Sequence, residues 1–166
     1  MYIAKSRSAW PCTLLHIYLK LQVLRNPVDT IATQMAYETF GEMDRSKFKS
    51  HVLINHSELL EFKIDAIMCC YEAVQHMQSN PNLDIEIHQL HLADLIRDPY
   101  KEMRKLCDFF EVECFDWYLD ACAGLVQTKL SKSRNQVIWS KELIRKAEEN
   151  MRKLPFLSRY SFTSED

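Results

Sequence analysis

The sequence predicts an α/β fold in which a parallel sheet carries helices on both faces. Two stretches rich in apolar and β-prone residues, 18–24 and 83–92, are separated by long segments whose apolar residues recur at helical spacing. Strands that are separated by helical crossovers pair in parallel. Two glycines among 166 residues argue against turn-dense all-β folds, which use glycine at tight turns. The composition, 47% hydrophobic and 27% charged, suits one ordinary core.

The elements are expected in the order strand, helix, helix, strand and three helices. The first strand runs into Arg25-Asn26-Pro27, where proline disfavours helix for its predecessor and is well placed to open a helix at 27–40. A polar and basic segment, 42–55, is expected to be a loop. A long amphipathic helix, 56–79, ends at Asn80-Pro81-Asn82. The last three helices are expected around 103–110, 117–126 and 143–154.

Charge and cysteine content argue against several classes of function. A net charge of −2 gives no field that would attract nucleic acid or an anionic membrane, so an anion site must be built locally. The six cysteines contain no CxxC pair, and several fall on apolar helical stripes, so neither a metal site nor a disulfide framework is expected. The apolar stretch 10–24 is interrupted by Lys20 and lacks a signal-peptide cleavage pattern, so no membrane span is expected.

Arg25 and Thr33 form the first candidate anion site. Arg25 is expected to leave the strand just before a helix N-terminus, and Thr33 lies eight residues later, about two helical turns along. A helix N-terminus favours phosphate, a guanidinium can clamp it, and a hydroxyl adds a donor. From the residues alone, the alternative is that Arg25 lies on the surface and that Thr33 bonds its own helix backbone.

A second candidate is the basic loop 129–135, which places three cations and two hydroxyls between two expected helices. This composition suits a phosphate, although most charged runs are solvated surface. A further stretch, LHLADLIRDPYKEMRKLCDFFEV, carries Asp94 before an apolar helix. An aspartate at such a position is ordinarily a cap, and we assign Asp94 a supporting role in the architecture.

Three strings, in order between about residues 21 and 162, resemble the sulfotransferases that use 3′-phosphoadenosine 5′-phosphosulfate (PAPS). They are VLRNPVDTIAT, the Asp94 stretch, and SKSRNQVIW followed by PFLSRYSF. In that family an arginine and a serine eight positions later hold the 3′-phosphate, and the resemblance assigns these roles to Arg25 and Thr33. In the same family a basic loop near the C-terminus closes over this phosphate. The resemblance therefore makes Arg134 the first candidate in the loop, followed by Ser133 and Lys132.

The resemblance implies a P-loop-NTPase-like sheet that is truncated at the N-terminus. On this reading, 1–20 is a non-matching segment and 21–166 is a sulfotransferase-like domain. The complete domain would be an enzyme that transfers a sulfuryl group from PAPS, its nucleotide sulfate donor, to a hydroxyl or amine of an acceptor, without a metal. The acceptor and the oligomeric state are left open. A cytoplasmic location is expected, or the Golgi lumen if a longer form carries an anchor.

The sequence does not contain the catalytic half of such a domain. No loop of the PKSGTT kind precedes Arg25, and the family's general base lies in the interval that is missing with it. No catalytic residue is therefore assigned, and the chain retains mainly the half that binds the 3′-phosphate. The alternative is a catalytically inactive nucleotide-binding or protein-interaction fragment. A nucleotide kinase is set aside because GxxxxGK[ST] is not found.

Overall fold

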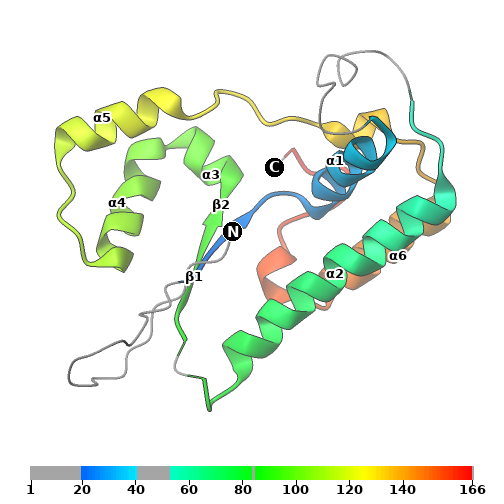
Figure 1. The fold of residues 1–166 in the computed structure, drawn as a ribbon, viewed down its shortest axis with the longest axis horizontal. Coiled ribbons are helices and arrows are strands. Elements are labelled where there is room, and N and C mark those ends of the chain that lie inside the picture. Colours follow the sequence, from blue (N-terminus) through cyan, green and yellow to red (C-terminus); the bar gives the residue numbers. More distant parts are fainter. Residues whose placement is uncertain (1–19, 41–52, 84, 166) are drawn as a thin grey trace. The chain divides into compact units, whose positions relative to one another are not determined.

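The computed structural model describes residues 20–40, 53–83 and 85–165 (Figure 1). This part of the chain is mostly helical, with a small two-stranded parallel sheet, which confirms the α/β class. It groups into two compact units, each made of two separate stretches of chain. The first unit comprises the described residues up to Arg25 together with His76–Leu130, and the second comprises Asn26–Gln75 together with Ser131–Asp166. The predicted segment 1–20 lies almost wholly outside the described residues.

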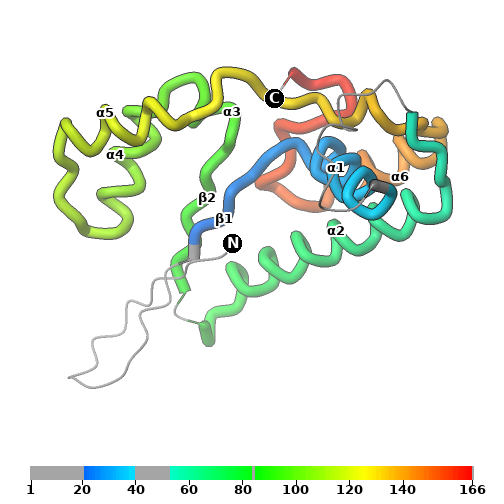
Figure 2. Tube along the Cα trace, turned by 45° about the horizontal axis from the view of Figure 1, so that its top comes forward, coloured from blue at the N-terminus to red at the C-terminus, as the bar shows by residue number. Residues whose placement is uncertain are grey.

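The first unit contains the sheet and three helices. Strands β1 (Lys20–Leu24) and β2 (Ile87–His91) pair in parallel, with Leu24 opposite His91, as the helical crossover between them predicts. After β2 the chain forms α3 (Leu92–Arg97), α4 (Pro99–Phe110) and α5 (Asp116–Leu125), and the last two lie side by side (Figure 2). Leu24, Leu90 and Leu119 are among the buried apolar side chains of this unit.

Two details of this unit differ from the sequence prediction. The predicted strand 83–92 is shorter: β2 begins at Ile87, and it ends at His91 because Leu92 already begins α3, a helix that the periodicity did not reveal. Asp94 does not cap this helix: it lies within the first turn, and its carboxylate pairs with Arg97 at 3.1 Å. The side-chain cap in this region is Asp98, which accepts the N–H of Lys101 at 3.0 Å and starts α4.

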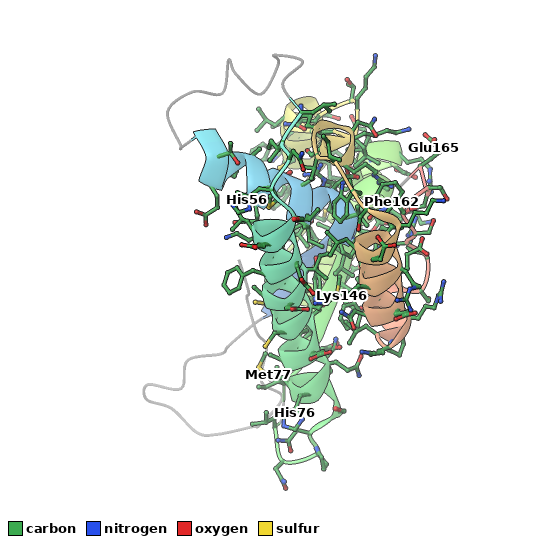
Figure 3. The ribbon with its side chains drawn as sticks, turned by 90° about the vertical axis from the view of Figure 1, so that its right-hand side faces the viewer. His56, His76, Met77, Lys146, Phe162 and Glu165 are labelled. Atoms are coloured by element: carbon green, nitrogen blue, oxygen red, sulfur yellow. The ribbon has the colours of Figure 1, made fainter. Side chains whose placement is uncertain are left out.

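The second unit is built from helices α1 (Pro27–Phe40), α2 (Ser57–Ser79) and α6 (Lys141–Arg152), with the 3₁₀ turns η2 (Ser133–Gln136) and η3 (Pro155–Leu157). Most of α2, up to Gln75, belongs to this unit. Helices α2 and α6 lie side by side, and Lys146 donates to Glu61 at 2.9 Å and to Asp65 at 2.8 Å (Figure 3). A parallel bridge between Ile54 and Val137 anchors the chain before α2 to the end of η2.

The helices that the sequence predicts in the second unit are found at the expected places. Helix α2 buries Leu60, Ile64 and Met68 at spacings of four residues, so the apolar stripe is the face that packs inward. Helix α6 buries Leu143, Ala147 and Met151 in the same way. The predicted loop 42–55 falls mainly outside the described residues, apart from its last residues around Ile54.

Candidate functional site

Local sequence fixes the start of α1, and with it the position of Thr33. Asn26 is fully buried and caps the helix, because its Oδ1 accepts the N–H of Val28 at 3.0 Å. Pro27 occupies the first helical position, where a missing N–H costs nothing. Thr33 therefore stands in the second turn of α1, where this helix packs against η2.

Three hydroxyl side chains gather at this contact. We call Thr33, Ser131 and Ser133 the hydroxyl cluster. The oxygen of Thr33 lies 3.0 Å from that of Ser133, and Ser133 lies 3.2 Å from Ser131. Thr33 Oγ1 is also 2.8 Å from the carbonyl oxygen of Asp29, one turn earlier in α1. Because a hydroxyl has a single proton, Thr33 cannot donate to the carbonyl and to Ser133 at once. When Thr33 donates to the carbonyl of Asp29, it can form the contact with Ser133 only as an acceptor.

A buried ion pair holds η2 against α1. The carboxylate of Asp29 and the guanidinium of Arg134 face each other with Nη2 2.5 Å from Oδ2 and Nε 3.1 Å from Oδ1. The same carboxylate accepts the backbone N–H of Arg134 at 2.9 Å. Asp29 is 3% exposed and Arg134 is 5% exposed, so both charges are removed from water and depend on each other. The pair fixes the backbone next to Ser133, and so it positions the hydroxyl cluster.

The segment 161–165 completes the surroundings of Arg134. Its Nη1 donates to the carbonyl oxygens of Ser161 and Phe162. Asn26 Nδ2 donates to the carbonyl of Ser161 and to the hydroxyl of Ser164, both at 2.9 Å. A guanidinium has five N–H groups, and four of those of Arg134 are directed at Asp29 or at these carbonyls. These contacts hold the guanidinium of Arg134 between α1 and the segment 161–165.

Lys132 lies beside the cluster and carries a more exposed charge. Its Nζ is 2.5 Å from Oε2 of Glu165, and the two side chains are 43% and 85% exposed. The hydrogen bond from Lys132 and its positive charge lower the pKa of the Glu165 carboxyl below its ordinary value. Because exposed ion pairs are screened by water and contribute little to stability, Glu165 can be exchanged for another anion.

The structure brings some of the predicted residues together. Thr33 and Ser133, which are 100 positions apart, are in contact. Arg134 and Lys132 flank Ser133, the first buried against Asp29 and the second at the surface. Arg25 follows the last residue of β1 and is half-buried in the first unit, so its predicted place at a strand exit before a helix is confirmed. The phosphate-binding roles assigned to these residues stay predictions.

Several residues of this region were not candidates in the sequence. Asp29 lies in the first turn of α1, and its pairing with Arg134 was not predicted. Ser131 belonged to the basic loop without being singled out. Asn26 and Glu165 carried no pattern that would have indicated contacts with the cluster or with Lys132. Such pairings over more than 30 residues leave no periodicity in a single sequence.

The cluster can offer hydroxyl donors and one ammonium group to an anion. Thr33 is half-buried and Ser131 is exposed, whereas Ser133 lies beneath them with 5% exposure. The two outer hydroxyls and Lys132 are thus the groups that an incoming phosphate would meet. Hydrogen bonds to a charged acceptor are shorter and stronger than those between neutral groups, which suits these side chains to a phosphate oxygen.

Within 20–40, 53–83 and 85–165, no set of three or more histidine, cysteine, aspartate or glutamate side chains is arranged to hold a metal ion. No helix in these ranges is both long enough and apolar enough to cross a bilayer. No protein-family model matches the sequence, and the comparisons with curated proteins and with solved structures also gave no match.

Proposed function

We propose that this chain is the 3′-phosphate-binding part of a PAPS-dependent sulfotransferase domain of P-loop-like fold. The observation that carries the proposal is the contact between Thr33 and Ser133, at 3.0 Å. The resemblance assigns both residues to the same phosphate although they come from distant parts of the chain. A shared ligand requires that they lie within one phosphate's reach, and this requirement is met.

The phosphate is received by the outer hydroxyls of the cluster. Ser131 donates to its oxygens, and Thr33 does so once its proton turns from the carbonyl of Asp29 to the phosphate, while Ser133 stays in contact with both at 3.0 and 3.2 Å. The phosphate replaces Glu165 as the partner of Lys132, which supplies a positive charge. Arg134 is a positioning residue in this proposal, because its guanidinium is engaged by Asp29 and by the carbonyls of 161–162.

Binding, and not turnover, is the activity that we assign to this chain. The sequence contains no phosphosulfate loop of the PKSGTT kind, and no residue is nominated as general base. In the complete domain the same phosphate site would hold PAPS while other segments perform the sulfuryl transfer to an acceptor hydroxyl or amine. Arg25 is expected to contribute to this affinity, as the resemblance implies, and Arg25→Ala tests that role separately.

Titration calorimetry with adenosine 3′,5′-bisphosphate, the desulfated form of PAPS, tests the proposal. Thr33→Val removes the hydroxyl and keeps the shape of the side chain. We expect it to weaken binding by about tenfold or more, the effect of losing one hydrogen bond to a charged group.

Thr39→Val is the matched control. Thr39 lies in the same helix, and its hydroxyl also donates to the carbonyl four residues earlier, at 2.8 Å from Met35 O, but it is outside the cluster. Its substitution should leave the affinity unchanged. Equal affinities for both variants would overturn the assignment of the cluster, and the absence of binding to the unaltered chain would overturn the proposed function itself.

A further inference from the structure

The first unit contains a hollow between α4 and α5 that is unrelated to the hydroxyl cluster. Its volume is about 300 Å³, at the lower end of the range for small-molecule sites. Most of its wall is apolar, and four of its lining residues are aromatic: Phe110, Phe115, Trp117 and Tyr118. The size suits a compact ligand group and not an extended one.

The aromatic rings are grouped and largely uncovered. Phe115 and Trp117 are stacked with centroids 6.2 Å apart, and Trp117 meets Tyr118 edge to face at 6.1 Å. Trp117 is 69% exposed, which leaves a large ring available at the mouth of the hollow. Aromatic rings attract cations through their negative faces, and tryptophan does so most strongly.

Glu113 is the one charged residue among those that line the hollow. No hydrogen bond or ion pair is formed by its carboxylate within the described residues, whereas two neighbouring acids have partners. Asp116 pairs with Arg104 at 3.2 Å, and Asp120 accepts from Tyr100 Oη at 2.9 Å. The run 111–120 contains four acidic residues and neither lysine nor arginine. The hollow therefore combines an apolar aromatic wall with an uncompensated negative charge.

We propose that this hollow binds a small organic cation, namely an ammonium group that carries methyl or short alkyl substituents. Such a group offers an apolar surface to Phe115 and Trp117 and a diffuse positive charge to their rings and to Glu113. A neutral apolar ligand would cover the carboxylate and give it no partner, which is unfavourable. A strongly hydrated inorganic cation would find one carboxylate and no further oxygen ligands, which does not suit it.

Choline and its neutral carbon isostere, 3,3-dimethylbutan-1-ol, separate charge from shape. Both are titrated into the full chain, and the indole N–H signal of Trp117, assigned with Trp117→Phe, reports binding by NMR. Choline should bind about two- to fivefold more tightly than the isostere, which is the range of a partly exposed cation–π interaction. Glu113→Gln should reduce this preference, and Glu72→Gln, which removes an equal charge from the exposed surface of α2, should not.

Three results would overturn the proposal. They are equal affinities for choline and the isostere, an unchanged preference in Glu113→Gln, or no response of the Trp117 signal to either compound. Far-UV circular dichroism of each variant shows whether the helices remain intact. Both substituted glutamates are exposed, so no loss of folding is expected from either.

Discussion

The pair formed by Asp29 and Arg134 leads to the sharpest prediction for stability. In the unaltered chain the backbone N–H of Arg134 lies 2.9 Å from Oδ1 of Asp29. Asp29→Asn keeps an oxygen that can accept this N–H, but it removes the negative charge. The guanidinium, which is 5% exposed, would then remain buried without a counter-charge. Breaking a buried pair in this way costs about 3–5 kcal/mol. This is a large share of the roughly 5–15 kcal/mol by which domains are stable.

Urea unfolding, followed by circular dichroism and by tryptophan fluorescence, measures this loss. Glu149→Gln is the control, because Glu149 forms an exposed pair with Arg145 at 3.2 Å, and such i,i+4 pairs contribute about 0.3–0.5 kcal/mol. Asp29→Leu combined with Arg134→Met removes both charges. This double variant should be more stable than Asp29→Asn. It should still be less stable than the unaltered chain by about 1–3 kcal/mol, because the backbone N–H at position 134 loses its acceptor. A loss in Asp29→Asn no larger than that of the control would refute the view that this pair holds η2 in place.

Three further predictions concern side chains outside that pair. Burial raises the pKa of the Cys107 thiol to about 11, so little of the reactive thiolate is present at pH 8. Mass spectrometry after iodoacetamide treatment at this pH should find the exposed Cys69 alkylated well before Cys107. Ser140 caps α6 through its side chain, so Ser140→Ala should lower the unfolding free energy by about 1 kcal/mol in the same urea assay. Lys132 lowers the pKa of the Glu165 carboxyl in the folded chain. The ion pair should therefore persist above the ordinary carboxyl pKa and be lost as the pH falls through the lowered value. A carboxyl ¹³C titration should show that the pKa of Glu165 rises in Lys132→Met.

The sequence predicted those elements whose signals are local. The helix at 27–40 was found at its expected bounds, because Pro27 is well placed to open a helix at this position. The stripe of α2 and the parallel pairing of β1 with β2 followed from the same kind of reasoning. Helix α3 was missed because Leu92 reads equally well as the end of an apolar strand, and six residues are too few to establish a helical period.

The sequence singled out some residues of this region but not the bonds between them. Thr33 and Ser133, which the family resemblance assigns to the same phosphate, are in contact. Arg134 ranked first among the phosphate candidates of the basic loop, yet four of its N–H groups face Asp29 and the carbonyls of 161–162. A sequence shows that an arginine is present in a basic loop but not which carboxylate the folded chain brings to it. Burial decides between a structural and a ligand-binding guanidinium, and burial depends on contacts over about a hundred residues.

The comparison of two nucleotides tests the central claim most directly. Titration calorimetry should show that adenosine 3′,5′-bisphosphate binds this chain at least about tenfold more tightly than adenosine 5′-monophosphate, because the 3′-phosphate alone meets the hydroxyls of Thr33 and Ser131. Equal affinities for the two nucleotides would contradict the account, since a chain that gains nothing from the 3′-phosphate has no site for it at the hydroxyl cluster.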